Sequence, residues 1–365
     1  MFRTLLPLLL SSACWSQTAL PAYPQQTEGD FVIRNFIFQS GEALPELRLH
    51  YITIGKPIRD ASGHVNNAVL IMHGTGGTGG AFTGAGFGGE LFVAGQPLDA
   101  AKYFIILPDA IGHGKSSKPS DGLHARFPQY RYGDMVRANY SMVRDGLKID
   151  HLRLVMGTSM GAMETWLWGE MYPDNVDALM PLASAPVEIV GRNRMFRAMI
   201  IDAIRADPAW NGGDYAAPPA QGLIAAQYAL WMMTSSALQL QKINPTREKA
   251  DAAVEALRKR ALATDANDML YQFDASIGYN PSPLLETIKA PLYAVNSADD
   301  EVNPPELGIL DREIKRVPRG RYILIPTSDE TRGHGTHTRA VVWKKYLAEL
   351  LQESQPDLKT ESSAH

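Results

Sequence analysis

The sequence predicts a three-layer α/β protein with a mostly parallel sheet and an inserted helical cap, and three observations support this prediction. First, the chain contains six short apolar runs of the kind that form strands buried on both faces of a sheet. Second, helix-length segments separate several of these runs, as parallel connections require. Third, about a hundred consecutive residues have helical patterns and no convincing strand, which indicates a cap over one end of the sheet.

The expected elements follow in order from the amino end. Asp30–Gly41 and Glu46–Pro57 alternate apolar and polar residues and end at Gly or Pro, which predicts an antiparallel hairpin. The expected buried strands are Ala68–Gly74, Tyr103–Asp109, Leu152–Gly157, Asp177–Ser184, Pro291–Ser297 and Arg321–Thr327. The expected helices are Gly133–Leu147, Ala162–Tyr172, Met195–Ala206, Leu223–Leu240 and Arg247–Ala263. This pattern predicts an α/β core (30–185 and 289–352), a helical cap (186–288) and a flexible tail (353–365).

The first 22 residues have the layout of a secretory signal peptide. Arg3 supplies a positive charge, Leu5–Leu10 is mostly apolar, and small residues follow before Ala22. We therefore expect export to the periplasm or the medium, and the apolar run is too short to span a bilayer. Lipidation of Cys14 is the alternative, although a lipoprotein signal favours a larger aliphatic residue than Ser11 three places earlier.

Composition excludes several classes of function. The 365 residues have a formal net charge of −4, which gives no electrostatic basis for binding nucleic acid or an anionic membrane. Cys14 is the only cysteine, so removal of the leader would leave no thiol for a nucleophile, a disulfide or a metal site. The glycine-rich loop His73–Gly80 matches no nucleotide-binding pattern, and we expect neither a cofactor nor a metal.

The most informative stretch is LRLVMGTSMGAMETW, from Leu152 to Trp166. It places Ser159 in a G-x-S-x-G pattern between an expected buried strand and an expected helix. The pattern is typical of a nucleophile elbow, a sharp turn that exposes the hydroxyl and whose glycines avoid clashes with neighbouring backbone. A plain turn is the alternative, so other parts of the chain must supply the partners that a serine nucleophile needs.

A serine nucleophile needs a histidine base and an acid that orients the base, and in this kind of fold the chain order is serine, acid, histidine. Asp300 follows the fifth expected buried strand and is the favoured acid, with Asp299 as the alternative. His334 follows the sixth strand and is the favoured base, with His337 as the alternative. The sequence thus predicts that Ser159, Asp300 and His334 form a catalytic triad.

An oxyanion hole requires two backbone N–H groups in a site that is shielded from water. Met160, which follows the nucleophile, is expected to supply one of them. The loop His73–Gly80 is expected to supply the other, with Thr75 as the favoured donor. His73 and His113 are expected to have structural roles.

A succession of stretches resembles the α/β-hydrolase superfamily and, within it, the homoserine O-acetyltransferase-like branch. These stretches lie between about Leu49 and Leu351 and read YITIGKP, NNAVLIMHGTGG, LDAAKYFIILPDAIGHGKSS, RYGDMVRANYSMV, GTSMGAMETWLW, IRADPAWNGGDY, YQFDAS, DEVNPP and GHG. The resemblance implies an α/β-hydrolase fold and assigns Ser159, Asp300 and His334 to the triad. It also implies a small-molecule acyl substrate and a homodimer.

The sequence departs from this branch in three respects. Thr158 stands where the acetyltransferases tend to have a second glycine, and HGTGG replaces a bulkier H-x-L-T-G loop. The branch is expected to have an arginine that binds the carboxylate of an amino-acid substrate, and the corresponding position in this sequence falls near Ile201. The third departure is the leader, since an exported enzyme would not meet acetyl-CoA.

These departures disfavour homoserine as the substrate. We therefore expect an exported serine hydrolase that acts on a carboxylic ester through an acyl-enzyme. The alternative is an acyltransferase that passes the acyl group to an alcohol acceptor. A non-catalytic binding protein on the same scaffold would be expected to lack a triad residue, and the sequence retains a candidate for each.

Overall fold

One eight-stranded sheet forms the centre of the molecule, with the strand order β1-β2-β4-β3-β5-β6-β7-β8. The computed structural model describes residues 23–355, so the expected leader and most of the expected tail lie outside the described residues. The strands are β1 (Thr27–Ile37), β2 (Ala43–Ile54), β3 (Ala68–Met72), β4 (Phe104–Pro108), β5 (Leu154–Thr158), β6 (Leu179–Leu182), β7 (Leu292–Ser297) and β8 (Gly320–Ile325).

The sheet is mostly parallel, as expected. β1 and β2 form the predicted antiparallel hairpin, and β2 also pairs antiparallel with β4. All the other neighbouring strands are parallel. Each of the six predicted buried strands is present, and its ends lie within two residues of the predicted ends. Unbroken apolar runs identify these strands because helices cover both faces of a parallel sheet.

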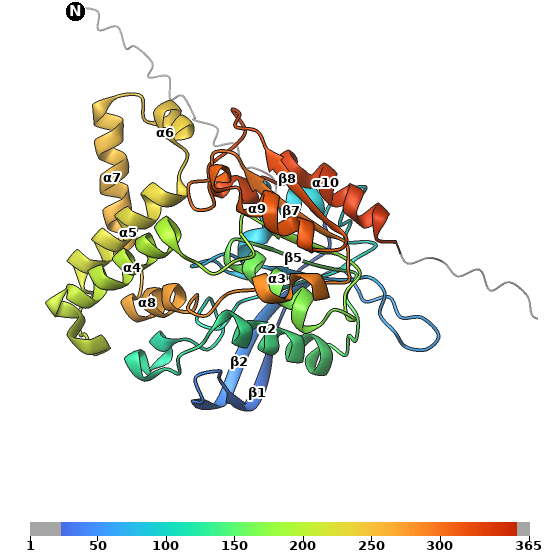
Figure 1. The fold of residues 1–365 in the computed structure, drawn as a ribbon. Coiled ribbons are helices and arrows are strands. Elements are labelled where there is room, and N and C mark those ends of the chain that lie inside the picture. The colour runs from blue at the N-terminus through green and yellow to red at the C-terminus, as the bar shows by residue number, and fades with distance from the viewer. Residues whose placement is uncertain (1–22, 356–365) are drawn as a thin grey trace, which may run out of the picture.

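Helices on the two faces of the sheet complete the three layers (Figure 1). The helices are α1 (Gly88–Leu91), α2 (Tyr132–Ser141), α3 (Met160–Met171), α4 (Gly191–Ala206), α5 (Ala220–Thr234), α6 (Ala237–Ile243), α7 (Arg247–Ala261), α8 (Ala266–Asp274), α9 (Ile309–Glu313) and α10 (Ala340–Glu353). Alternate side chains of β3 enter different cores: Val69 and Ile71 join α1 and α10, whereas Leu70 and Met72 join α2 and α3. None of the helices in residues 23–355 combines the length and hydrophobicity needed to cross a membrane.

The segment between β6 and β7 forms α4–α8, which we call the cap, and the described chain has no strand there. These helices lie together at one end of the sheet, on the left of Figure 1. The single helix predicted over Leu223–Leu240 is wrong, because the backbone becomes extended at Ser235 and divides it into α5 and α6. Helix α8 has no counterpart in the prediction. The helix predicted over Gly133–Leu147 is shorter, and its last residues form a wider π-helical turn after Ser141.

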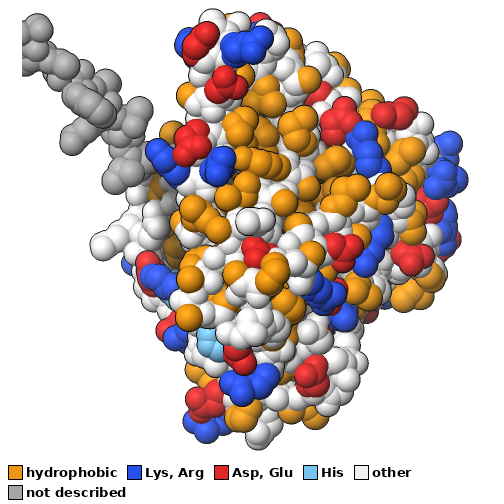
Figure 2. Space-filling view, turned by 90° about the vertical axis from the view of Figure 1, so that its left-hand side faces the viewer, with side chains coloured by type: hydrophobic (Ala, Val, Ile, Leu, Met, Phe, Trp, Pro, Cys, Tyr) orange, Lys and Arg blue, Asp and Glu red, His pale blue; other side chains and the backbone are white. Residues whose placement is uncertain are grey.

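The cap carries several exposed apolar side chains, which contribute to the hydrophobic surface seen from this side in Figure 2. Met195, Met199, Met232 and Ile243 are each more than half exposed. A partner molecule could cover such a surface. The homodimer that the resemblance implies stays a prediction.

Candidate active site

The stretch around Ser159 forms a sharp turn between β5 and α3. Ser159 has φ 52° and ψ −108°, a left-handed backbone conformation that residues with a side chain seldom adopt. A Cβ atom on Gly157 would lie 2.2 Å from the carbonyl carbon of Gly161, and a Cβ atom on Gly161 would lie 2.1 Å from the carbonyl oxygen of Met72. Only glycine fits at either position, which is the steric reason for the pattern G-x-S-x-G.

The carboxyl ends of three strands bring Ser159, His334 and Asp300 together. Ser159 directly follows β5, Asp300 follows β7, and His334 follows β8. The Ser159 hydroxyl donates a hydrogen bond of 2.8 Å to His334 Nε2, and His334 Nδ1–H donates one of 2.9 Å to Asp300 Oδ2. A hydroxyl, a base and an orienting acid linked in this way can act as a nucleophilic unit.

Asp300 is buried and yet favours its charged form. Burial of this side chain, of which 2% is exposed, would by itself raise its pKa. The interaction with His334 and hydrogen bonds from the Val302 N–H (2.8 Å) and the Asn303 amide (3.2 Å) outweigh this effect, so the pKa of Asp300 lies below its ordinary value. Asn303 also donates to the Ala183 carbonyl oxygen (3.1 Å), which connects this loop to the end of β6.

The two residues in each pair that the sequence left open have different contacts. Asp299 forms no hydrogen bond with His334; its Oδ2 accepts hydrogen bonds of 2.9 Å from the Thr331 hydroxyl and from the Gly333 N–H. It thereby anchors the loop that carries His334. The ring of His337 lies edge-on to that of His334, with 5.3 Å between centroids, and burial lowers the pKa of His337 to about 3. His334 and not His337 hydrogen-bonds to the Ser159 hydroxyl.

The loop after β3 lies beside Ser159 and offers a backbone donor. A Cβ atom on Gly74 would lie 3.3 Å from Ser159 Cβ, so the loop approaches closely. The Thr75 and Met160 N–H groups have no hydrogen-bond partner among the described residues, as oxyanion donors require. His73 uses both ring nitrogens on the backbone: Nδ1–H donates to the Gly74 carbonyl oxygen (2.8 Å) and Nε2 accepts from the Ala110 N–H (3.0 Å). His73 therefore orders this loop.

Ser159 and His334 line a cavity of about 440 Å³ between the sheet and the cap. Phe196, Arg197 and Phe273 from the cap contribute to its wall, and no Asp or Glu side chain of the described residues lines it. Among residues 23–355, no group of three or more His, Cys, Asp and Glu side chains is arranged to hold a metal ion. The cavity is therefore suited to organic substrates that contain an apolar part and at least one polar or anionic group.

Arg197 is the charged group of this cavity, and it is 2% exposed. Its Nε donates to the Asn193 side chain (2.9 Å) and its Nη1 to the Tyr132 hydroxyl (3.4 Å). No described Asp or Glu forms an ion pair with it, which is unusual for a buried arginine. The resemblance described in the sequence analysis places a carboxylate-binding arginine near Ile201. Arg197 lies one helical turn earlier on the same face of α4, so the resemblance did not single it out.

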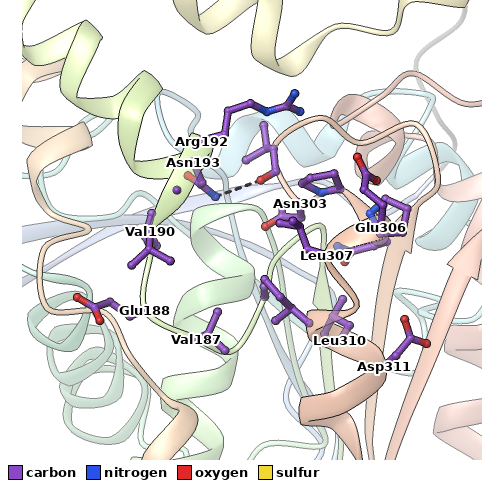
Figure 3. Close-up of a pocket in the computed structure, with 18 of the residues that line it drawn as sticks. Val187, Glu188, Val190, Arg192, Asn193, Asn303, Glu306, Leu307, Leu310 and Asp311 are labelled. Atoms are coloured by element: carbon purple, nitrogen blue, oxygen red, sulfur yellow. Dashed lines mark hydrogen bonds between the residues drawn. The ribbon is translucent and has the colours of Figure 1, made fainter.

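A second cavity, of about 520 Å³, is lined by the loop that follows β7 and by the start of α4 (Figure 3). Val302 lines both cavities and therefore separates them. The side chain of Asn193 donates to the Val302 carbonyl oxygen (3.3 Å), and this hydrogen bond connects the start of α4 to the loop after β7 (Figure 3). Of the two residues that donate to Asp300, Val302 thus lines both cavities and Asn303 lines only the second.

Comparison with known proteins identifies the family. Residues 67–330 match the family described as the α/β hydrolase fold. The chain belongs to the α/β hydrolase family. The expected three-layer fold and the resemblance noted in the sequence are thereby confirmed.

The similar proteins include both acyltransferases and esterases. A probable acyltransferase of Methanothermobacter thermautotrophicus is 26% identical over 306 residues, which cover 83% of this chain and 91% of that protein. A homoserine O-acetyltransferase of Haemophilus influenzae is 29% identical over 300 residues, which cover 73% and 81%. Among solved structures, the acetyl esterase MekB is 27% identical with a TM-score of 0.77, over 89% of this chain and 97% of that chain. Acyl transfer to an alcohol, the alternative in the sequence analysis, thus has better support than the expected ester hydrolysis.

Proposed function

We propose that this α/β hydrolase transfers an acyl group from an ester or thioester to an alcohol acceptor through an acyl-enzyme on Ser159. The observation that carries the proposal is the hydrogen-bonded series Ser159–His334–Asp300 at the edge of a cavity between the sheet and the cap. The acyltransferase relatives support transfer as the outcome of the reaction.

In the proposed first half-reaction, Ser159 Oγ attacks the carbonyl carbon of the acyl donor while His334 Nε2 takes the hydroxyl proton. The N–H groups of Met160 and Thr75 donate to the oxyanion of the tetrahedral intermediate. The intermediate then collapses, the bond to the leaving group breaks, and His334 returns its proton to that group. Asp300 accepts the hydrogen bond from Nδ1–H and stabilises the imidazolium throughout.

In the second half-reaction, His334 takes the proton of the acceptor hydroxyl, whose oxygen attacks the acyl-enzyme. The same steps in reverse release the new ester and restore the Ser159 hydroxyl. Arg197 is placed in the same cavity without a carboxylate partner, and we propose that it pairs with a carboxylate on the acceptor. An acceptor of this kind resembles homoserine, the substrate in the names of several relatives.

Hydrolysis is the second candidate, and the likeness to an acetyl esterase favours it. Water would then replace the alcohol in the second half-reaction. Both candidates need the same acyl-enzyme, so they differ in how well the cap keeps water from it.

We also propose that the protein is exported, on the basis of the pattern in residues 1–22. Export would make an ester a more accessible acyl donor than acetyl-CoA. Mass spectrometry of the protein from fractionated cells tests this proposal, and an intact amino terminus on a cytosolic protein would contradict it.

The substitution Ser159→Ala tests the acyl-enzyme. It should lower the turnover of p-nitrophenyl acetate by about 10⁴-fold, because the nucleophile is lost while the fold remains. A fluorophosphonate should label the unaltered protein at Ser159 and leave the variant unlabelled. Unchanged turnover in a variant with an unchanged circular dichroism spectrum would refute the proposal.

Arg197→Met tests the acceptor. It should raise the KM for a hydroxy-acid acceptor by about 10- to 100-fold, since a charged hydrogen bond is lost, while the KM for its methyl ester stays nearly constant. Arg197→Lys is the matched control, because it keeps the charge and should retain part of the discrimination. The ratio of transferred product to free acid, measured by chromatography, also separates transfer from hydrolysis.

A further inference from the structure

The second cavity has the size and lining of a small-molecule site. Its volume of about 520 Å³ is within the usual range for ligand pockets. Apolar side chains from the loop after β6 and from the segment after β7 form most of its wall: Val187, Val190, Leu307 and Leu310 are labelled in Figure 3. These walls come from separate elements, and the exposure of Val190 and Leu307 shows that the cavity opens to solvent.

One buried amide in the cavity lining lacks an acceptor. Asn296 is 3% exposed, its Oδ1 accepts from the Ser184 N–H (3.3 Å), and its Nδ2 has no partner among the described residues. A buried donor without an acceptor is unfavourable, and a ligand carbonyl oxygen would satisfy it once the Asn296 amide, whose Nδ2 is now closed off, turns toward the cavity. The lining therefore combines an apolar wall with one unused hydrogen-bond donor.

Charges in the lining disfavour an anionic ligand. Glu188, Glu306 and Asp311 contribute exposed carboxylates, and Figure 3 shows them around the cavity. Within residues 23–355, Arg192 is the only Lys or Arg in the lining, and it is already paired with the Glu301 side chain and carbonyl oxygen. A ligand with a carboxylate would meet net negative charge, whereas a neutral ligand would not.

The cavity is also connected to Asp300. Val302 and Asn303 belong to its wall, and both donate hydrogen bonds to the Asp300 carboxylate. A ligand that moves either residue would change how Asp300 orients His334.

We propose that this second cavity binds a small, neutral, apolar molecule with one carbonyl group, and that its occupancy alters the reaction rate at Ser159. Binding is independent of the proposed function, whereas the effect on rate rests on it. The two parts can therefore fail separately.

Methyl hexyl ketone is the probe, and its binding to the full protein is measured by isothermal titration calorimetry. Saturable binding is expected for the unaltered protein and for Ser159→Ala, and octanoate should bind at least about tenfold more weakly because its charge must be desolvated. Val190→Trp and Leu307→Trp should abolish ketone binding, since both residues line the cavity and are more than half exposed, so the larger ring is tolerated by the fold. Val254→Trp on α7, at a residue that is 46% exposed and does not line the cavity, is the control and should bind normally.

Saturating ketone should also change kcat for p-nitrophenyl acetate by about fivefold in the unaltered protein and in Val254→Trp, and not in the two cavity variants. Ketone binding that both cavity variants retain, or that a fluorophosphonate on Ser159 abolishes, would overturn the site. Binding that the cavity variants lose, without any change of rate in the unaltered protein, would overturn the connection to Asp300.

Discussion

Asp299 and Asp300 are neighbours in the chain and have different tasks. The carboxylate of Asp300 receives the hydrogen bond from His334, while that of Asp299 receives hydrogen bonds from the loop that carries His334. Asp300 therefore acts on His334 directly, whereas Asp299 holds the loop that positions His334. The orientation of His334 depends on both.

Exchange of each carboxylate for an amide should separate the two tasks. Asp300→Asn should lower kcat by about 10⁴-fold with little change in the melting temperature, because the amide favours the wrong histidine tautomer. Asp299→Asn should lower the melting temperature and reduce kcat much less, since it weakens the anchors of a loop. Steady-state kinetics and thermal unfolding measure both effects, and equal losses of kcat in the two variants would contradict these assignments.

At this scale the sequence predicts which residues meet, but only in part how they are held. Ser159, Asp300 and His334 could be placed because each follows a recognisable strand, and strand ends converge at one edge of a parallel sheet. Asn303 and Arg197 could not, because their roles depend on loop shape and on the rotation of α4. The proline-rich stretch after Asp300 suggests a stiff loop, yet nothing in it singles out the asparagine.

At the scale of elements, α3 combines the proposed nucleophile with an unusual buried acid. Glu164 lies in the first half of the helix, is fully buried, and has one hydrogen bond, from the Asn139 amide (3.3 Å). Burial raises the pKa of Glu164 to about 8. The helix that begins at the active site therefore contains a carboxyl group that is protonated at neutral pH.

This shift predicts how stability depends on pH. The folded-state pKa of about 8 exceeds the ordinary value of 4.5, so folding binds a proton between these values and the contribution to stability is lost as pH rises through 8. Glu164→Gln should therefore raise the free energy of unfolding at pH 8.5 by at least about 1 kcal/mol relative to the unaltered protein, and by much less at pH 4.5. Urea unfolding at both values is the measurement. Burial also raises the pKa of Glu170 to about 8. Glu170→Gln and the double variant are therefore the controls, because they separate the pH dependence that each carboxyl group contributes.

The elements themselves were predictable to different degrees. Strands β3–β8 could be located because each is a short apolar run buried on both sides. The end of α5 was missed, although Thr234, Ser235 and Ser236 interrupt the apolar run after Leu230 and serine commonly precedes a new helix. Cap helices pack partly on one another and partly on the core, so their apolar faces do not follow one simple period.

At the scale of the whole molecule, helix α8 forms hydrogen bonds between the cap and the core. The Tyr271 hydroxyl of α8 lies 2.7 Å from the Phe127 carbonyl oxygen and 2.9 Å from that of Ala125, both in the connection between β4 and α2. Asp268 of the same helix accepts hydrogen bonds from the Ser120 N–H (2.9 Å) and hydroxyl (2.7 Å). Helix α8 therefore fastens the cap to the core.

Weakening this connection should admit water. Tyr271→Phe should lower the free energy of unfolding by about 1 kcal/mol and raise the share of free acid over transferred product, because a looser cap excludes water less well. Tyr215→Phe is the matched control: its hydroxyl bonds to Asp265 (2.6 Å) and accepts from the Ala266 N–H (3.0 Å), both within the cap. It should lose similar stability without a change in the product ratio. Identical product ratios for the two variants would argue against a closing role for α8.

The left-handed backbone of Ser159 has a consequence for how this protein changes over generations. A side chain held in that conformation costs of the order of 1–3 kcal/mol, and glycine would relieve most of it. Mutations at this position that increase stability therefore remove the hydroxyl that the reaction is proposed to need. Under selection for stability alone, Ser159 would give way to glycine, so a serine at this position is what the proposed acyl-enzyme requires.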